Sequence, residues 1–301
     1  MSVWTVVGAA SDPDTYFCKH LVARIEKAEE GATSTFACML EIDFMQLVQE
    51  KKVSSGGKYF THKELYAVER NGELVGDLMA LIDIATKEFG MEDAEIANTI
   101  LFEKQAKIET AKLIRARSHP SVTLQFTDTE PIGKEDPVEY AKIVVELFDD
   151  YAPKAVENFV ALCTGKNESG VSYVDCPVHR IVPGGWLQCG DVVDGSGKNS
   201  SAVVEAGMTK FEDESFSIDF GGKFGGVVGY SSSETHANGS QFFVTLGPCE
   251  WMNNTVVGFG RVVQGFRALQ AMQKVQLTNE RPVIAITVTE STVFTEATTK
   301  Q

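Results

Sequence analysis

The sequence has few of the features that mark a membrane-bound, secreted or nucleic-acid-binding protein. Its 27 lysines and arginines are outnumbered by 42 aspartates and glutamates, which leaves a net charge of −15. A nucleic-acid backbone and an anionic membrane surface both favour lysine and arginine. No apolar run approaches the ~18 residues that span a bilayer, and the N-terminal segment lacks the basic region and long apolar core of a secretory signal. We therefore expect no nucleic-acid or membrane partner and a cytoplasmic location.

The cysteines form no recognisable redox or metal motif. All six are scattered along the chain without a CxxC pair or the spacing of a zinc site, at Cys18, Cys38, Cys163, Cys176, Cys189 and Cys249. Free thiols in a reducing compartment are the state that this distribution favours. The sequence predicts no metal site and no cofactor.

Residues 1–90 alternate between strand-like and helix-like patterns. The predicted order is strand, helix, strand, helix, two strands and helix, over residues 3–8, 11–30, 33–40, 43–52, 64–68, 74–75 and 77–89. Asn71-Gly72, between the two adjacent strands, is a strong hairpin signal. This β-α-β-α-β-β-α order resembles that of a thioredoxin-like domain, and we expect such an α/β domain at 1–90.

The redox motif of thioredoxin-like enzymes is missing from this region. Their cysteines lie in the loop that is here Asp12-Pro13-Asp14-Thr15, and Cys18 follows a turn later without a partner. A thiolate without a resolving thiol cannot run a disulfide cycle. We therefore expect a domain without redox activity, followed by a helical linker at 91–119 that ends before a proline.

Residues 120–295 have the pattern of a small antiparallel β-barrel. Short runs of β-branched and aromatic residues are separated by turns rich in glycine, serine and asparagine, and occur at 122–126, 141–147, 241–245, 256–259 and 283–288. Two helices are predicted, at 153–163 and 265–273. We expect an eight-stranded antiparallel barrel with two covering helices, and a short tail at 296–301.

Six blocks in this C-terminal region are similar, in order and spacing, to those of cyclophilins, a family of peptidyl-prolyl cis-trans isomerases. They are APKAVENF with LCTG (152–165), VHRIVPG (178–184), QCGD (188–191), FEDE (211–214), NGSQFF (238–243) and FG (259–260). Gly185-Trp186, the NERP sequence at 279–282 and the N-terminal extension resemble the peptidyl-prolyl isomerase-like 6 subgroup. That resemblance implies an association with motile cilia or flagella, including the radial spokes of the axoneme.

The resemblance also implies which residues form the site. Arg180 matches the catalytic arginine, and Gln188 matches a glutamine that orients it. The residues at substrate-contacting positions are Trp186, Phe243 and Met252 for the proline cup, Trp251 for the rim that also contacts cyclosporin-type ligands, and Gln241 and Ser232 for the substrate backbone. His179, next to Arg180, points to the opposite face of a strand and is expected to be structural.

An arginine and an apolar cup suit the isomerisation of an Xaa-Pro bond. Amide resonance imposes a barrier of roughly 18–20 kcal/mol on rotation about the C–N bond. A permanently protonated guanidinium can stabilise the lone pair that develops on the prolyl nitrogen and hold the proline carbonyl, while the cup holds the ring and excludes water. The reaction needs no proton transfer, metal or cofactor. Its substrates would be proline-containing peptides or proteins.

Three places depart from the cyclophilin pattern. Gly185 stands where the family has a phenylalanine wall of the cup, Val256 replaces a histidine, and 231–233 (SSS) replaces an Ala-Asn-Ala run. The electrostatic half of the site is intact and the apolar half is altered, so we expect attenuated isomerase activity. The alternative is a weak or inactive domain that serves as a docking component of a larger assembly such as the axoneme. Arg180, Gln188 and Gln241 favour the enzyme, whereas Gly185 and Val256 favour docking.

Overall fold

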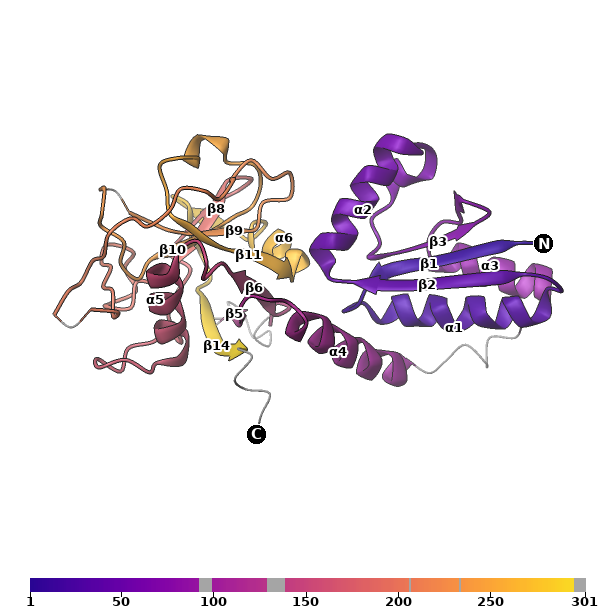
Figure 1. Ribbon diagram of the computed structural model, residues 1–301, viewed down its shortest axis with the longest axis horizontal. Helices are drawn as coiled ribbons and strands as arrows, with labels where there is room; N and C mark the ends of the chain where they lie inside the picture. The colour runs from indigo at the N-terminus through magenta and orange to yellow at the C-terminus, as the bar shows by residue number, and fades with distance from the viewer. Residues whose placement is uncertain (92–98, 129–138, 206, 233, 295–301) are drawn as a thin grey trace. The chain divides into compact units, whose positions relative to one another are not determined.

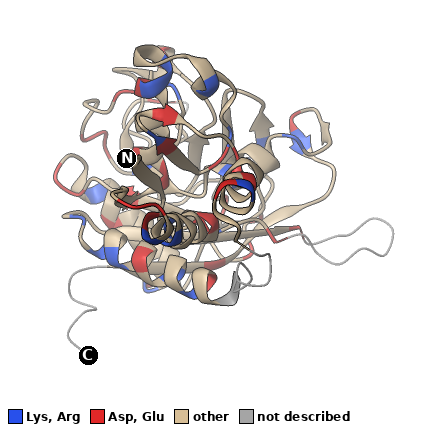
Figure 2. Cartoon of the chain, turned by 90° about the vertical axis from the view of Figure 1, so that its right-hand side faces the viewer, with Lys and Arg blue, Asp and Glu red and all other residues tan. Residues whose placement is uncertain are grey.

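The chain folds into two compact units. The computed structural model describes residues 1–91, 99–128, 139–205, 207–232 and 234–294, and the chain divides into a first unit, Met1–Ala116, and a second unit, Arg117–Gln301 (Figure 1). The predicted tail at 296–301 and Ser233 lie outside these described residues. No helix within them is long and apolar enough to cross a membrane. Figure 2 shows basic and acidic residues together on the helices.

The first unit contains a four-stranded sheet with helices packed on it. Its elements are β1 (Val3–Ala9), α1 (Pro13–Ala28), β2 (Thr33–Met39), α2 (Glu41–Ser54), the 3-10 helix η1 (Gly57–Thr61), β3 (Tyr66–Arg70), β4 (Glu73–Leu74), α3 (Leu78–Phe89) and α4 (Thr99–Arg115). The strand order is β2-β1-β3-β4, with β1 and β2 parallel and the other pairs antiparallel. The elements up to α3, apart from η1, follow the order expected from the sequence. The thioredoxin-like assignment stays a prediction.

Both faces of this sheet are buried, and β1 contributes to both. Successive strand residues point to opposite sides, so Val6 packs with α1, α3 and α4, whereas Val7 packs in a separate cluster with Phe44 and Val48 of α2. This explains why β1 is apolar along most of its length instead of alternating with polar residues. The helices therefore lie on two sides of the sheet, with α2 opposite the others.

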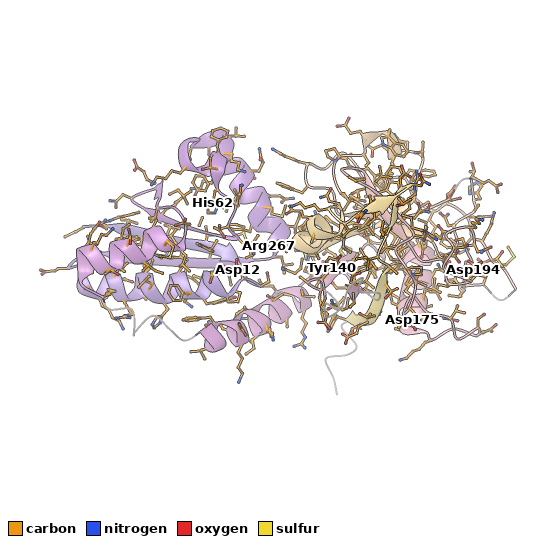
Figure 3. All side chains as sticks on the ribbon, turned by 180° about the vertical axis from the view of Figure 1, so that it is seen from behind. Asp12, His62, Tyr140, Asp175, Asp194 and Arg267 are labelled. Carbon is orange, nitrogen blue, oxygen red and sulfur yellow. The ribbon has the colours of Figure 1, made fainter. Side chains whose placement is uncertain are left out.

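The loop at residues 12–15 forms the start of helix α1. Asp12, labelled in Figure 3, accepts a hydrogen bond from the Asp14 N–H (3.1 Å), and Pro13 occupies the first turn of α1. Cys18 is fully buried; burial, followed by the charges of Asp14 and Asp12, raises its pKa well above the ordinary value. All six cysteines are free thiols, and Cys38 is the one that is not fully buried.

Titration of the native protein with a thiol reagent should single out Cys38. At about pH 8 we expect Cys38 to react roughly tenfold or more faster than the other thiols, because reactivity follows exposure and thiolate fraction. The Cys38→Ser variant should lose the fast phase, and the control variant Cys18→Ser should keep it. A fast phase that disappears in Cys18→Ser instead would show a reactive thiol where we expect none.

The helix that the sequence suggested as an interdomain linker packs into the first unit. Phe102 and Ala106 of α4 are buried in the same cluster as α1 and α3, and the Phe102 ring contacts Phe17 edge to face at 5.8 Å between centroids. The first compact unit thus extends to Ala116, beyond residue 90, at which the sequence analysis ended the α/β domain. An apolar stripe shows that a helix packs, but it does not show on what. Residues 92–98 of the expected linker lie outside the described part of the chain.

The second unit contains an eight-stranded antiparallel sheet. Its elements are β5 (Ser121–Asp128), β6 (Ile143–Leu147), α5 (Pro153–Thr164), β7 (Arg180–Val182), β8 (Trp186–Cys189), β9 (Val227–Tyr230), β10 (Phe242–Thr245), η3 (Glu250–Met252), β11 (Gly258–Gln264), α6 (Phe266–Met272), β12 (Leu277–Thr278), β13 (Arg281–Pro282) and β14 (Ile286–Phe294). The strand order is β14-β5-β6-β11-β9-β10-β8-β7, and each pair is antiparallel. The prediction of eight antiparallel strands with two helices is confirmed. A separate two-stranded hairpin, β12–β13, precedes β14.

The two ends of this sheet are bridged by an irregular segment and not by a continuous ladder. In the described strand pairs, β7 pairs with β8 and β14 with β5. The residues just before β7 bond to β14 instead, from Asp175 N–H to Val288 O (2.8 Å) and from Val178 N–H to Ile286 O (2.7 Å). Asp175 is labelled in Figure 3. The sheet is therefore a curled half-barrel, and the expectation of an eight-stranded barrel is corrected to this open form, whose ends β7 and β14 are linked through the irregular segment before β7.

Aromatic rings pack α5 against the curled sheet. Phe159 of α5 contacts Tyr173, Phe242 and Phe259, with ring centroids 5.0–5.2 Å apart. Phe259 is fully buried in this core. Because β10 carries Phe242 into this cluster, the next residue, Phe243, is directed to the opposite side of the strand. The core thus fixes the strand from which the candidate site is built.

Candidate functional site

Arg180 lies on the short β7–β8 hairpin at one end of the sheet. It is paired with Gln188 across the two strands. Its side chain is 44% exposed, whereas neighbouring His179 is buried, as strand alternation requires. The guanidinium carbon lies 5.1 Å from the centre of the Trp186 ring. Arg180 Nε donates a hydrogen bond to Glu280 Oε2 at 2.6 Å, a partner that the sequence analysis did not assign to the site.

A chain of side-chain amides extends from Gln188 into the protein. Gln188 Nε2 donates to Gln241 Oε1 at 2.7 Å, and Gln241 Nε2 donates to the backbone carbonyls of Gly197 (3.0 Å) and Asn199 (2.7 Å). Gln241 is buried, so these bonds satisfy an amide that water cannot reach. The two predicted glutamines are thus in contact, and Gln188 is held by Gln241 at a position facing Arg180.

The carboxylate of Asp191 holds the loop that supplies those two carbonyls. It accepts backbone N–H bonds of 2.8–3.3 Å from Val193, Asp194, Gly197 and Asn199. Burial alone would raise the pKa of Asp191, but the donated hydrogen bonds outweigh burial, and the pKa lies below its ordinary value. The loop is also closely packed, because a Cβ added at Gly197 would lie 2.4 Å from the His179 ring. The loop therefore holds the Gln241 side chain in place, and Gln241 in turn holds that of Gln188.

An apolar cluster adjoins Arg180 through Trp186. The cluster consists of buried Phe220, Val227, Phe243, Cys249 and Met252, with Trp186, Ile218 and Val256 partly buried against them. Phe243 lies directly opposite Gln188 in the β8–β10 pair. The structure thus brings together the three residues expected in the proline cup, and we call this set the apolar cluster.

Sequence reasoning missed several members of the apolar cluster. Phe220 and Cys249 lie outside the sheet strands, where no strand period marks them as buried. Phe220 is followed by a glycine-rich stretch that suggests only turns. Its ring lies 5.9 Å from that of Phe243. The position of a bulky apolar residue just before a glycine-rich stretch was the sequence signal that could have marked Phe220 as buried.

Trp251 stands at the rim of the apolar cluster. It lies on η3 and is 65% exposed. Its ring contacts that of Trp186 at 5.8 Å between centroids with an angle of 62°. An indole exposed to this extent beside a second one offers apolar contact area and an N–H donor to a ligand.

Ser232 lies on the wall of a neighbouring cavity of about 430 Å³. The lining is formed by Asp213, Phe216, Tyr230, Ser232, Glu234, Thr235, Asn238, Asn254, Thr255, Val256 and Val257. Val256 belongs both to this cavity and to the apolar cluster, so a peptide bound at the cluster could continue into the cavity. The Ser232 hydroxyl donates to the backbone carbonyl of Glu234 at 2.6 Å. The hydroxyl proton of Ser232 is therefore bonded within its own loop.

Gly185 precedes Trp186 and adds no side chain to the apolar cluster. Its carbonyl accepts a weak hydrogen bond from Cys249 Sγ at 3.5 Å. A Cβ at this position would approach Val182 Cγ1 to 3.1 Å, so a larger side chain requires a small shift of its neighbour. At Val256 the cluster is lined by an aliphatic side chain, which can pack on a prolyl ring but donates no hydrogen bond.

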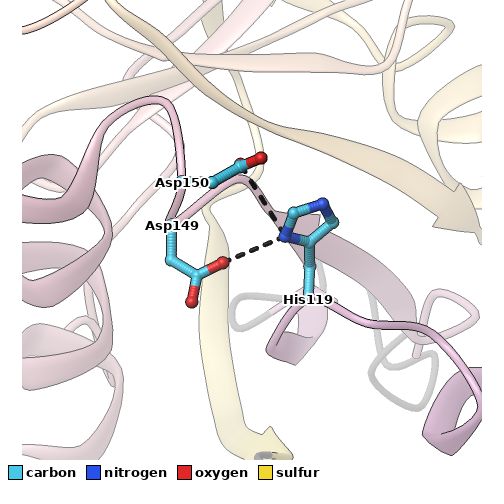
Figure 4. Close-up of side chains that lie close together, drawn as sticks. All are labelled: His119, Asp149 and Asp150. Atoms are coloured by element: carbon cyan, nitrogen blue, oxygen red, sulfur yellow. Dashed lines mark hydrogen bonds and ion pairs between the residues drawn. The ribbon is translucent and has the colours of Figure 1, made fainter.

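One group of possible metal-ligating side chains occurs among the described residues, and it lies at the start of the second unit. His119, Asp149 and Asp150 place one ligand atom each within 4.8 Å of one another (Figure 4). His119 Nδ1 is 3.0 Å from Asp149 Oδ1, and the ring packs edge to face on Phe148 at 5.6 Å. Both carboxylates are about half exposed. We assign these contacts to anchoring the residues before β5.

His179 makes the stability of the second unit depend on pH. Burial, followed by the charge of Arg281, lowers the pKa of His179 below its ordinary value of 6.5. The unfolded chain therefore binds a proton at a pH where the folded chain does not, so stability is present above about pH 6.5 and decreases as the pH falls below it. In urea unfolding between about pH 7.5 and 5, His179→Gln should reduce this loss of stability.

The matched control for that measurement is His20→Gln, in the first unit. It should leave the pH dependence of the second unit unchanged. An unaltered slope in His179→Gln would contradict the role given to His179.

Known proteins match both the site-bearing unit and much of the rest of the chain. A family profile described as "Cyclophilin type peptidyl-prolyl cis-trans isomerase/CLD" matches residues 137–293. The human protein "Probable inactive peptidyl-prolyl cis-trans isomerase-like 6" is 32% identical over 257 residues, which cover 83% of this chain and 78% of the human protein. The Bos taurus protein of the same name is 33% identical over 257 residues, or 83% and 79% of the two chains.

A plant protein matches a shorter stretch. "Peptidyl-prolyl cis-trans isomerase CYP22" of Arabidopsis thaliana is 35% identical over 154 residues, which cover 50% of this chain and 75% of the plant protein. The mammalian alignments are longer than the second unit, residues 117–301, and so include part of the first.

Proposed function

Because the chain belongs to the cyclophilin-type peptidyl-prolyl cis-trans isomerase family, we propose that it isomerises Xaa-Pro bonds in peptides or proteins with attenuated activity. One observation carries this proposal: Arg180 faces Gln188 across a strand pair, beside an apolar cluster that includes Phe243 and Met252. A charged donor and an apolar surface are thus available side by side, which is the combination that rotation about a prolyl amide requires.

In this proposal Arg180 supplies the electrostatic part of catalysis. Its Nε–H is taken by Glu280, so the N–H groups of its two Nη atoms are the ones that would hold the proline carbonyl and stabilise the prolyl nitrogen. Stabilisation of this kind is effective when the donors are already in place before the reaction. The stacking on Trp186 and the fixed strand pair supply that order.

The apolar cluster would hold the pyrrolidine ring while the amide rotates. Phe243 and Met252 form its buried surface, and Trp186 covers one side. Ser232 would contact the substrate backbone, and Trp251 would contact the flanking residues or a cyclosporin-type ligand. Gln241, expected from the resemblance to contact the substrate, has its side-chain amide bonded to Gln188, Gly197 and Asn199 and would instead hold Gln188 in place. No cofactor enters this mechanism.

Two changes in the cluster support reduced activity. A missing phenylalanine at Gly185 removes apolar contact worth on the order of 3 kcal/mol if the ring were fully buried. Val256 lacks the donor of the histidine that cyclophilins have at this position. The printed names of the mammalian relatives, "Probable inactive", agree with a weakened site.

A second candidate function is docking without significant catalysis. The same changes at Gly185 and Val256 support it, as does the presence of a separate folded unit in front of the cyclophilin unit. The first unit would then be a thioredoxin-like adaptor without redox activity, since Cys18 is buried and has no partner cysteine in its loop. Resemblance to the peptidyl-prolyl isomerase-like 6 subgroup supports a place in the cytoplasm and in a ciliary or flagellar assembly such as the radial spoke.

Exchange NMR on a proline tetrapeptide separates the two functions. Uncatalysed cis/trans exchange takes tens of seconds or longer, so even weak catalysis gives exchange peaks with an Ala-Ala-Pro-Phe peptide. We expect catalysis by the natural protein and a loss of roughly 100-fold or more in Arg180→Ala, as found for removal of one preorganised donor elsewhere.

An exposed arginine on α6 supplies the control for this measurement. Arg267→Ala should exchange the peptide like the natural protein. Background exchange with the natural protein would refute the isomerase and leave the docking function. Exchange that survives in Arg180→Ala would refute the role of Arg180.

A further inference from the structure

Glu280 occupies a turn position at which glycine is the usual residue. It is the second residue of the two-residue turn that joins β12 to β13, after Asn279. Both residues have positive φ, +51° for Asn279 and +64° for Glu280. Turns of this kind favour Asn-Gly, because a residue with a Cβ is strained in the left-handed region. A glutamate that is held there despite the strain suggests that its side chain has a function.

The turn is fixed against the strand that carries Arg180. The Ile181 N–H donates to the backbone carbonyl of Glu280 at 2.6 Å. On the other side of the turn, Arg281 Nη2 donates to Ser196 O at 2.6 Å, and Arg281 Nε donates to His179 O at 3.4 Å. The turn is thus held at the Glu280 carbonyl and at the Arg281 side chain. This position places the Glu280 side chain close to Arg180.

The Glu280 carboxylate forms an ion pair with Arg180, the proposed catalytic group. Its Oε2 lies 2.6 Å from Arg180 Nε, and the two side chains are 47% and 44% exposed. The guanidinium is therefore bounded by a negative charge at its edge and by the Trp186 ring 5.1 Å away. A neighbouring carboxylate weakens the positive potential that the guanidinium presents to a prolyl nitrogen or carbonyl.

We propose that Glu280 is a built-in restraint on the isomerase site: its carboxylate partly neutralises Arg180 and lowers the rate at which the site acts. This inference rests on the proposed isomerase function and adds a cause of attenuation that is independent of the altered apolar cluster. Because the pair is about half exposed, its free energy corresponds to at most about a fivefold change in rate. The restraint is therefore partial, and it should weaken as salt screens the pair.

The opposite effect, in which Glu280 helps catalysis by orienting Arg180, predicts a different order of variants. Glu280→Gln keeps an oxygen that accepts the Nε–H but removes the charge. Glu280→Ala removes both. If the charge restrains the site, Glu280→Gln is faster than the natural protein. If orientation matters, Glu280→Gln catalyses exchange at the same rate as the natural protein, and Glu280→Ala catalyses it at a lower rate.

The test is exchange NMR of an Ala-Ala-Pro-Phe peptide with the full chain. Glu280→Gln should raise kcat/KM by about two- to fivefold at low ionic strength, and about 0.5 M NaCl should reduce that gain. The matched control is Glu290→Gln, which changes net charge equally at a glutamate of β14 that is 62% exposed and pairs with Lys142. It should give no gain. Adding Arg180→Ala to Glu280→Gln should abolish the gain.

The outcomes separate this inference from the function on which it rests. Arg180-dependent exchange that Glu280→Gln leaves unchanged or slows would overturn the restraint and keep the isomerase. Exchange that appears only in Glu280→Gln would support the restraint and show that the natural protein is held inactive. Background exchange in both proteins would overturn the two proposals together.

Discussion

The buried amide of Gln241 is the contact on which the candidate site depends. Its Nε2 bonds to two carbonyls of the loop that Asp191 organises, and its Oε1 receives the side chain of Gln188. Removing it would take a hydrogen-bond donor from two carbonyls of this half-buried loop and the acceptor from Gln188. A loop, β8 and β10 are thereby fixed relative to one another, which places Arg180 on β7 at a defined distance from the apolar cluster.

The site combines an ordered polar half with an open apolar half. Its polar half is held at several points, by strand pairing, by the amide chain and by the stacking of Arg180 on Trp186. Its apolar half receives no side chain from Gly185, and Val256 belongs both to the apolar cluster and to the neighbouring cavity. In the proposed function, these features and the carboxylate of Glu280 leave the polar contacts around Arg180 in place and weaken the action of the site on a proline. Such a site can bind and turn a proline slowly, or hold a proline-containing segment in an assembly.

Local signals in the sequence were sufficient for much of the fold. Alternating and helical periods and the hairpin signal at Asn71-Gly72 predicted the element order of the first unit, because these features act within a few residues. The packing of α4 through Phe102 could not be predicted, since periodicity marks an apolar face but not its partner. The irregular seam beside β14 was missed for a similar reason: hydrogen bonds from a segment without a strand pattern leave no periodic signal.

The candidate site, like the fold, contains some contacts that the sequence could predict and others that it could not. Arg180 and Gln188 belong to one short hairpin, so their proximity could be expected from the chain itself. Glu280 lies a hundred residues further along, and its contact depends on where a separate hairpin is docked. Phe220 joins the apolar cluster from a loop, which only the fold brings to Phe243.

Peptide titration followed by side-chain NMR tests the central claim most directly, namely that a proline peptide binds between Arg180 and the apolar cluster. The resonances to follow are the Arg180 Nε–H, the indole N–H groups of Trp186 and Trp251, and the side-chain amides of Gln188 and Gln241. On addition of Ala-Ala-Pro-Phe, the account predicts saturable shifts of these signals, while the indole of Trp4, buried in the first unit, stays unchanged. Shifts confined to other surfaces, or none at millimolar peptide, would contradict it.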